Sequence, residues 1–209
     1  MQMNGQVVSK LPQARQQGTP ALSLDYVGGT LVSELLPRYS MVNKSGLMYS
    51  AVGLAVTDFA AAASMSGLIL YNPAGSGVDA HFTKAFGQFI VSSPNETDLL
   101  IGVVRNQATP PTTTTAIAVQ NNYIGSNANT AGAVQAFSVA TLASAPVALL
   151  PVLHNTAAIA TTGEDQGFYI DLEGSLILGP GACVCLMSQG GTSASAALNA
   201  AFEWVELPI

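Results

Sequence analysis

Short apolar runs separated by Gly, Pro, Asn and Ser make up most of the chain after residue 46. Several runs alternate between apolar and polar residues, most regularly from Ala80 to Ser92. Alternation with a period of two is typical of a β-strand with one buried face. We expect strands at Leu47–Val56, Gly67–Tyr71, Ala80–Ser92, Leu99–Arg105, Val134–Val139, Val147–Leu153, Phe168–Leu172, Leu176–Leu178, Ala182–Met187 and Leu198–Leu207.

This pattern predicts an all-β protein. About eight or nine strands in about 160 residues is the number expected for a jelly-roll-like antiparallel β-sandwich. Helix signals are weak, because no long stretch combines helical periodicity with capping residues. Turn residues separate the predicted strands, as in the loop Asn72–Gly77, where Pro73 fixes φ and the glycines permit positive φ. We expect the segment Thr109–Thr115 to be a stiff, exposed loop, because consecutive prolines favour polyproline geometry.

Residues 1–45 have a different pattern from the rest of the chain. Prolines and glycines interrupt every possible element there, and no stripe of apolar residues could form a core. We therefore expect an extended N-terminal arm at 1–45 and a β-sandwich body at 46–209. The arm contains apolar residues and cations that suit a partner surface. The predicted partner-binding residues are Leu31, Leu35, Leu36, Arg38, Tyr39 and Lys44.

The composition indicates a surface with few charges. Only 9% of the 209 residues are charged, whereas about 25% is typical of soluble domains. A β-rich chain with so few surface charges suggests burial against other protein, and we expect a homo-oligomer, most simply a trimer. An extracellular domain that tolerates a neutral surface is the alternative explanation.

The charges that do occur are unevenly placed. Residues 1–45 carry four cations and two carboxylates (+4 − 2 = +2), and residues 46–209 carry two cations and ten carboxylates (+2 − 10 = −8). An acidic body is a poor partner for nucleic acid, which requires clustered Lys and Arg. The N-terminus lacks a secretory signal pattern and residues 51–70 are interrupted by Asp58, so we expect a soluble protein made in a cytoplasm, without a membrane partner.

Few residues could carry catalysis or bind a metal. The chain has two histidines, His81 and His154, and neither lies in a metal-binding motif. Asp79 and His81 share a strand face, and Asp171 and Glu173 are expected to share another. We interpret both pairs as solvated strand-end charges, with a weak acid/base or glycosidase-like site as the alternative. The expectation is a non-enzyme without cofactor or metal.

The cysteines and the large aromatic residues are assigned to the core. Cys183 and Cys185 lie two apart in a predicted strand, a spacing at the strained limit for a disulfide, so buried free thiols are favoured. The aromatic residues assigned to the sandwich core are Phe82, Phe86, Phe202 and Trp204. A nucleic-acid stacking face is the alternative, but Lys84 is the one cation that interleaves with them.

Four segments resemble a group of bacteriophage virion proteins. They are Glu34–Tyr39, Gly67–Gly77, Asp171–Gly181 and Phe202–Pro208. The resemblance implies a jelly-roll subunit on the outer surface of a tailed-phage head. It also implies a cement or decoration protein that bridges major capsid proteins, commonly as a trimer. The resemblance carries no catalytic residues. The alternatives are a tail-associated or receptor-binding β module of the same virion, or a carbohydrate-binding protein.

Overall fold

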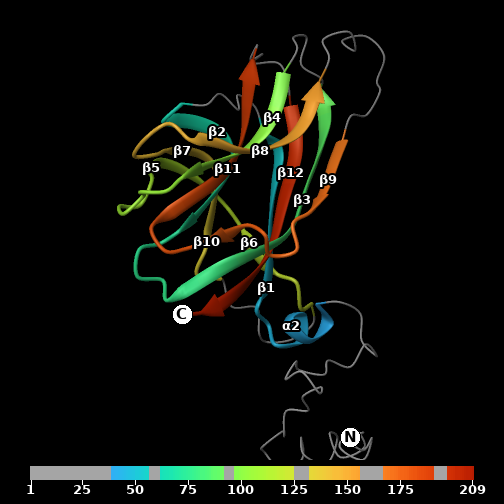
Figure 1. The fold of residues 1–209 in the computed structure, drawn as a ribbon, viewed down its shortest axis with the longest axis vertical. Helices are drawn as coiled ribbons and strands as arrows, with labels where there is room; N and C mark the ends of the chain where they lie inside the picture. Colours follow the sequence, from blue (N-terminus) through green and yellow to red (C-terminus); the bar gives the residue numbers. More distant parts are fainter. Residues whose placement is uncertain (1–38, 57–61, 92–96, 125–131, 156–166, 191–196) are drawn as a thin grey trace, which may run out of the picture. The chain divides into compact units, whose positions relative to one another are not determined.

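The computed structural model describes residues 39–56, 62–91, 97–124, 132–155, 167–190 and 197–209. The chain divides into two units, residues 1–41 and residues 42–209, and only 39–41 of the first are described. The second unit contains all the described strands (Figure 1). Within the described residues, no helix is long and apolar enough to cross a membrane.

The described part contains one short helix and twelve strands. Their bounds are α2 Ser40–Lys44, β1 Met48–Val56, β2 Ser64–Asn72, β3 Val78–Val91, β4 Thr97–Val104, β5 Thr112–Ile117, β6 Val119–Asn121, β7 Gln135–Thr141, β8 Val147–Asn155, β9 Gly167–Asp171, β10 Ile177–Leu178, β11 Ala182–Gly190 and β12 Ala197–Pro208. The predicted all-β class is confirmed.

The strands form two antiparallel sheets. Sheet 1 has the order β10-β3-β12-β1-β6, with β9 also paired to β3, and sheet 2 has the order β5-β7-β2-β11-β4-β8. Leaving β5 to β7 aside, the pairings are nested. The first strand pairs with the last (β1 with β12), β2 pairs with β11, β3 with β9 and β10, and β4 with β8. Each of these strands thus pairs with one from the other half of the chain. The sandwich therefore depends on contacts between residues that are distant in sequence.

The main core lies between the two sheets. Trp204 is fully buried and packs against two other aromatic rings, with centroid distances of 6.3 Å to Tyr49 and 6.2 Å to Phe82. Phe82 also meets Phe202 edge to face at 5.3 Å. This confirms the core assignment for three of the four predicted aromatic residues, Phe82, Phe202 and Trp204.

A second core covers the outer side of sheet 2. It contains Met65, Ile69, Tyr71, Leu100, Val104, Phe137, Ala140, Leu142, Cys183, Cys185 and Met187. The connections 105–111 and 142–146 each pass three strands of sheet 2, and the inner side is filled by the main core, so both cross the outer side. The Gln107 side chain ties them together, since its Oε1 accepts the Ala143 N–H at 2.7 Å.

Asn72 fixes the loop that the sequence predicted at Asn72–Gly77. Its buried Nδ2 donates to the Val78 carbonyl at 2.8 Å and to the Leu178 carbonyl at 2.9 Å. Gly75 and Gly77 have φ values of 80° and 73°, as the predicted turn requires. The side chain therefore joins the start of β3 to β10.

Two local predictions are wrong. Thr112–Thr115 belong to the edge strand β5 and not to a loop, because β-branched threonines favour extended pairing once β7 offers a partner. The residues remain exposed, as predicted. Residues 40–44, within the segment expected to be extended, form the helix α2. Gly46, at φ 72°, donates to the Asn43 carbonyl and ends this helix.

A bulge at Thr83 overturns the assignment of Phe86 to the core. Strand β12 pairs Glu203 with Lys84 and Trp204 with Phe82, so Thr83 is the extra residue. Phe82 is fully buried, but Phe86 is 38% exposed on the opposite face. Simple alternation places Phe82 and Phe86 together, and the bulge separates them.

Candidate interaction surfaces

Of the two pairs interpreted as strand-end charges, only Asp79 and His81 lie on one strand. Asp79 and His81 lie half-buried on β3, where they pair with Leu207 and Val205 of β12. Asp171 ends β9, whereas Glu173 lies in the following turn with φ 46°, so their expected common strand face is wrong. Among the described residues, no group of three His, Cys, Asp or Glu side chains could hold a metal ion.

The turn after β9 explains why the acidic pair separates. The Leu172 and Glu173 amides both donate to the Thr83 carbonyl, at 2.8 and 3.1 Å, and Gly174 donates to the Phe82 carbonyl at 2.7 Å. These bonds satisfy the backbone groups that the bulge removes from the strand ladder. The turn is therefore tied to the bulge.

Glu206 is a buried carboxylate with a structural role. Its Oε2 accepts the Ala133 amide at 2.8 Å, and its Oε1 accepts the Val134 amide and the Trp204 indole N–H, both at 3.1 Å. Three N–H donors in a buried position stabilise a carboxylate without a cation. Glu206 joins the segment before β7 to the last strand.

Glu203 organises a second polar cluster, on the outer face of sheet 1. Its carboxylate accepts the Thr83 hydroxyl at 3.0 Å and the Asn122 amide group at 3.2 Å, and lies 3.8 Å from the Lys84 ammonium. Asp171 is directly opposite Lys84 on β9. One cation thus lies between two acids in the row Glu203, Lys84, Asp171.

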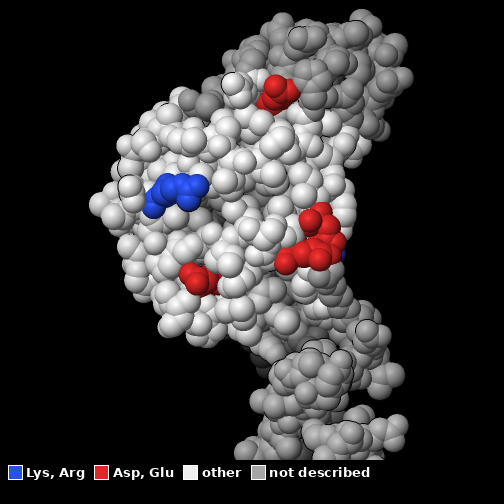
Figure 2. Space-filling view, in the orientation of Figure 1, with Lys and Arg blue, Asp and Glu red and all other residues white. Residues whose placement is uncertain are grey.

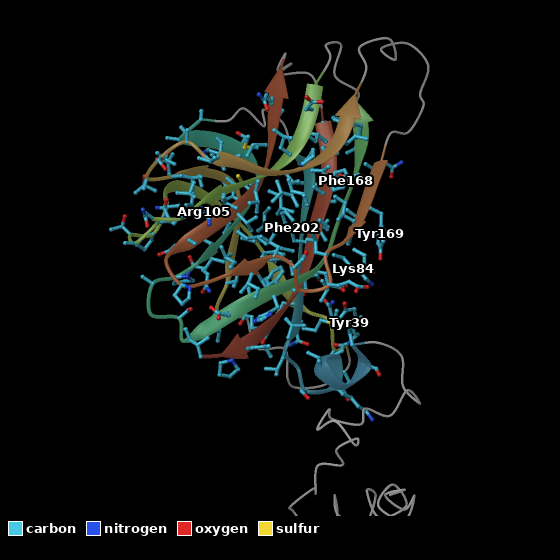
Figure 3. The ribbon with its side chains drawn as sticks, viewed as in Figure 1. Tyr39, Lys84, Arg105, Phe168, Tyr169 and Phe202 are labelled. Atoms are coloured by element: carbon cyan, nitrogen blue, oxygen red, sulfur yellow. The ribbon has the colours of Figure 1, made fainter. Side chains whose placement is uncertain are left out.

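Beside this charged row on the outer face of sheet 1 lies an apolar row, and the row after it, with Asn199 and Gln88, is polar. The residues Val52, Ala201, Phe86 and Tyr169 are cross-strand neighbours in one row over β1, β12, β3 and β9. Figure 3 shows Tyr169 directed away from Phe168 and Phe202, which lie on the inner side. The large exposed side chains of this surface, which we name the apolar face, are Val52, Leu54, Phe86, Ile90 and Tyr169.

A second exposed apolar surface lies at the end of sheet 2. Strand β8 pairs with β4 on one side only. Its exposed large side chains, which we name the β8 edge, are Val147, Leu149 and Leu150. Long apolar edge strands template association with other chains unless charges protect them. Residues 106–163, which include all of β8, contain no Lys, Arg, Asp or Glu.

The surface as a whole carries few charges. In the view of Figure 2, isolated charged groups are separated by broad areas without Lys, Arg, Asp or Glu. Arg105 is an exposed cation outside the apolar face (Figure 3).

The predicted partner-binding residues are largely beyond the described part. Leu31, Leu35, Leu36 and Arg38 lie outside the described residues. Tyr39 is half-buried, with φ 65°, immediately before α2, and Lys44 is exposed in the last turn of that helix. The apolar face and the β8 edge were not predicted as partner-binding surfaces.

The two cysteines are free and buried, as predicted. Burial raises the pKa of Cys183 to about 12, and burial, with a smaller effect from Cys183, also raises that of Cys185. Because the thiolate is the nucleophile, both thiols are unreactive near neutral pH. Native protein at pH 8 is expected to react with a thiol reagent at least about 100-fold more slowly than protein unfolded in guanidinium. Rapid labelling of the native chain would contradict the buried placement.

No protein-family model, curated protein or solved structure matches this chain.

Proposed function

We propose that this chain is a structural virion protein of a tailed bacteriophage. In this proposal it is a capsid cement or decoration protein that binds the shell of major capsid proteins on its outer surface and stabilises the head. It associates with copies of itself, acts without a cofactor and catalyses no reaction.

The observation that carries the proposal is the pair of exposed apolar surfaces on a charge-poor β-sandwich. The apolar face contributes five large exposed side chains and the β8 edge three. Contiguous exposed apolar surface on a soluble domain marks a site of contact with other protein. Since the described residues gather no metal cluster and the acids Asp171 and Glu173 are separated, binding explains this surface better than catalysis does.

The strand pairing supports a jelly roll. A jelly roll is made of eight strands in two sheets with nested, Greek-key connections. The pairings β1·β12, β2·β11, β3·β9/β10 and β4·β8 provide such nesting, and β5 to β7 are an insertion between β4 and β8. The jelly roll is thus our inference from the pairing order.

The phage assignment is supported by the sequence resemblance. Three of its four segments, Gly67–Gly77, Asp171–Gly181 and Phe202–Pro208, lie within the described residues and at places that determine the fold. Asn72 connects β3 to β10, Gly181 donates to the Asn72 carbonyl at 2.8 Å, and Trp204 and Glu206 join β12 to the core. These three segments thus consist of turns and strand contacts that determine the fold.

One observation favours a second candidate, a carbohydrate-binding protein. Tyr169 is 64% exposed and is the direct neighbour of Phe86 on the outer face. Exposed aromatic rings beside polar groups suit sugar rings. However, Val52, Leu54 and Ile90 on the same face are aliphatic, and aliphatic side chains suit a protein partner better.

The experiment is co-sedimentation of the full-length chain with heads that lack it. We expect saturable binding and heads that withstand a higher temperature. The variant Leu35→Asp/Leu36→Asp tests the predicted arm and should bind at least about tenfold more weakly. Binding by full-length protein that is equal to that of an unrelated protein of similar size would refute the capsid assignment. Retention on a glycan array without head binding would favour the second candidate.

A further inference from the structure

The two apolar surfaces differ in ways that bear on how copies associate. The apolar face lies beside the row Glu203, Lys84, Asp171, which has one cation and two acids. The β8 edge lies within the 58 uncharged residues from 106 to 163 (163 − 106 + 1). One surface is therefore flanked by net negative charge, and the other carries none.

We propose that the apolar face of one copy binds the β8 edge of the next copy, in a head-to-tail contact that closes into a ring. This inference rests on the self-association included in the proposed function. Its occupant is a second copy of this chain, and the residues in contact are Val52, Leu54, Phe86, Ile90 and Tyr169 of one copy with Val147, Leu149 and Leu150 of the other.

Electrostatics favours this contact over face-to-face pairing. If two apolar faces met across a two-fold axis, Glu203 and Asp171 of each copy would approach the same acids of the other, with only Lys84 from each to compensate. Like charges brought together at an interface are unfavourable. The uncharged β8 edge can cover the apolar face without that repulsion.

Strand β8 also differs from the other sheet edges. Strands β6, β10 and β9 have three, two and five residues, and β5 exposes threonines. Short and polar edges resist association, whereas β8 is nine residues long and mostly apolar. Pro151 lacks an amide donor, which limits extension of the sheet through this strand. The contact between the β8 edge and the apolar face is therefore made mainly by side chains. The outer face of a sheet offers side chains, and not backbone groups, to a partner.

The symmetry of the assembly follows from the requirement that both apolar surfaces are covered. A two-fold contact between two apolar faces leaves the β8 edge exposed on both copies, and one between two β8 edges leaves the apolar face exposed. A head-to-tail contact uses each surface once, and a closed ring leaves neither exposed. We expect three copies in the ring, the number predicted from the sequence.

The test uses full-length protein and two matched double variants. The face variant is Leu54→Lys/Tyr169→Lys, and the edge variant is Val147→Lys/Leu149→Lys. Ile124→Lys is the control, because Ile124 is 92% exposed and belongs to neither surface. Protection of Cys183 and Cys185 from a thiol reagent checks that each variant is folded. Single substitutions Leu54→Lys and Val147→Lys replace a double variant that fails this check.

Sedimentation velocity reads out the assembly. Wild type and Ile124→Lys should have the mass of three copies, and each double variant alone should assemble at least about tenfold more weakly. An equimolar mixture of the two double variants should form a dimer, because the intact edge of one meets the intact face of the other.

Three results would overturn the inference. They are a wild-type chain that is monomeric or dimeric at micromolar concentration, loss of assembly in only one of the variants, or a mixture that stays monomeric. The experiment needs no virion. Rings without head binding would refute only the proposed function, and head binding without rings would refute only this contact.

Discussion

Replacing Glu206 by alanine is expected to lower the free energy of unfolding by about 3 kcal/mol or more, because a buried donor left without a partner costs about 1–3 kcal/mol. The substitution removes the acceptor for the amides of Ala133 and Val134 and for the indole of Trp204. Urea denaturation followed by tryptophan fluorescence measures the change, since Trp204 is the only tryptophan.

The variant Glu206→Gln separates the loss of acceptors from the loss of volume. It keeps one side-chain oxygen as an acceptor but places an NH₂ group against the remaining N–H donors, so its effect should be intermediate. Asp171→Ala, at an exposed acid, is the control and should change stability by less than about 1 kcal/mol. Equal, small effects for Glu206→Ala and Asp171→Ala would contradict the structural role of Glu206.

Replacing Trp204 by alanine should have the second large effect, a loss of about 3–5 kcal/mol, as for other buried aromatic residues. Trp204 is fully buried and contacts the rings of Tyr49 and Phe82 from the two neighbouring strands. Thermal unfolding followed by far-ultraviolet circular dichroism measures it without tryptophan fluorescence. Tyr123→Ala, at an aromatic residue that is 37% exposed, is the control.

Trp204 and Glu206 should also be energetically coupled, because the indole N–H donates to the carboxylate. The milder variant Trp204→Phe keeps most of the ring and removes the donor. In a double-mutant cycle of Trp204→Phe with Glu206→Gln, we expect a coupling of about 0.5–3 kcal/mol. Additive effects would show that the hydrogen bond contributes nothing to stability.

Much of the fold was predictable from local pattern. Strands such as Ala182–Met187 and Leu198–Leu207 combine apolar runs with turn residues at both ends, and both were placed within a few residues. Trp204 and Phe202 were assigned to the core because they share one parity of a strand. The period of two shows which side chains of a strand share a face. It therefore predicts the core residues correctly wherever the strand is regular.

The sequence did not reveal the partners of the buried polar groups. Alternation places Glu206 on the same strand face as Phe202 and Trp204, but two of its three donors, Ala133 and Val134, are more than 70 residues away, so the pattern cannot show what satisfies it. The prolines before Thr112–Thr115 predict a loop, and pairing with β7 makes these residues a strand. Both features depend on contacts between distant segments.

The sequence by itself determined that the chain is all-β, poor in charge and without a recognisable catalytic motif. Only the tertiary structure decided which residues form the surface. Pairing with β12 places an extra residue at Thr83, so Phe82 turns into the core and Phe86 joins Val52 and Tyr169 outside. The physical reason is that a strand's own alternation cannot show a bulge, which arises from a difference in residue count between two paired strands.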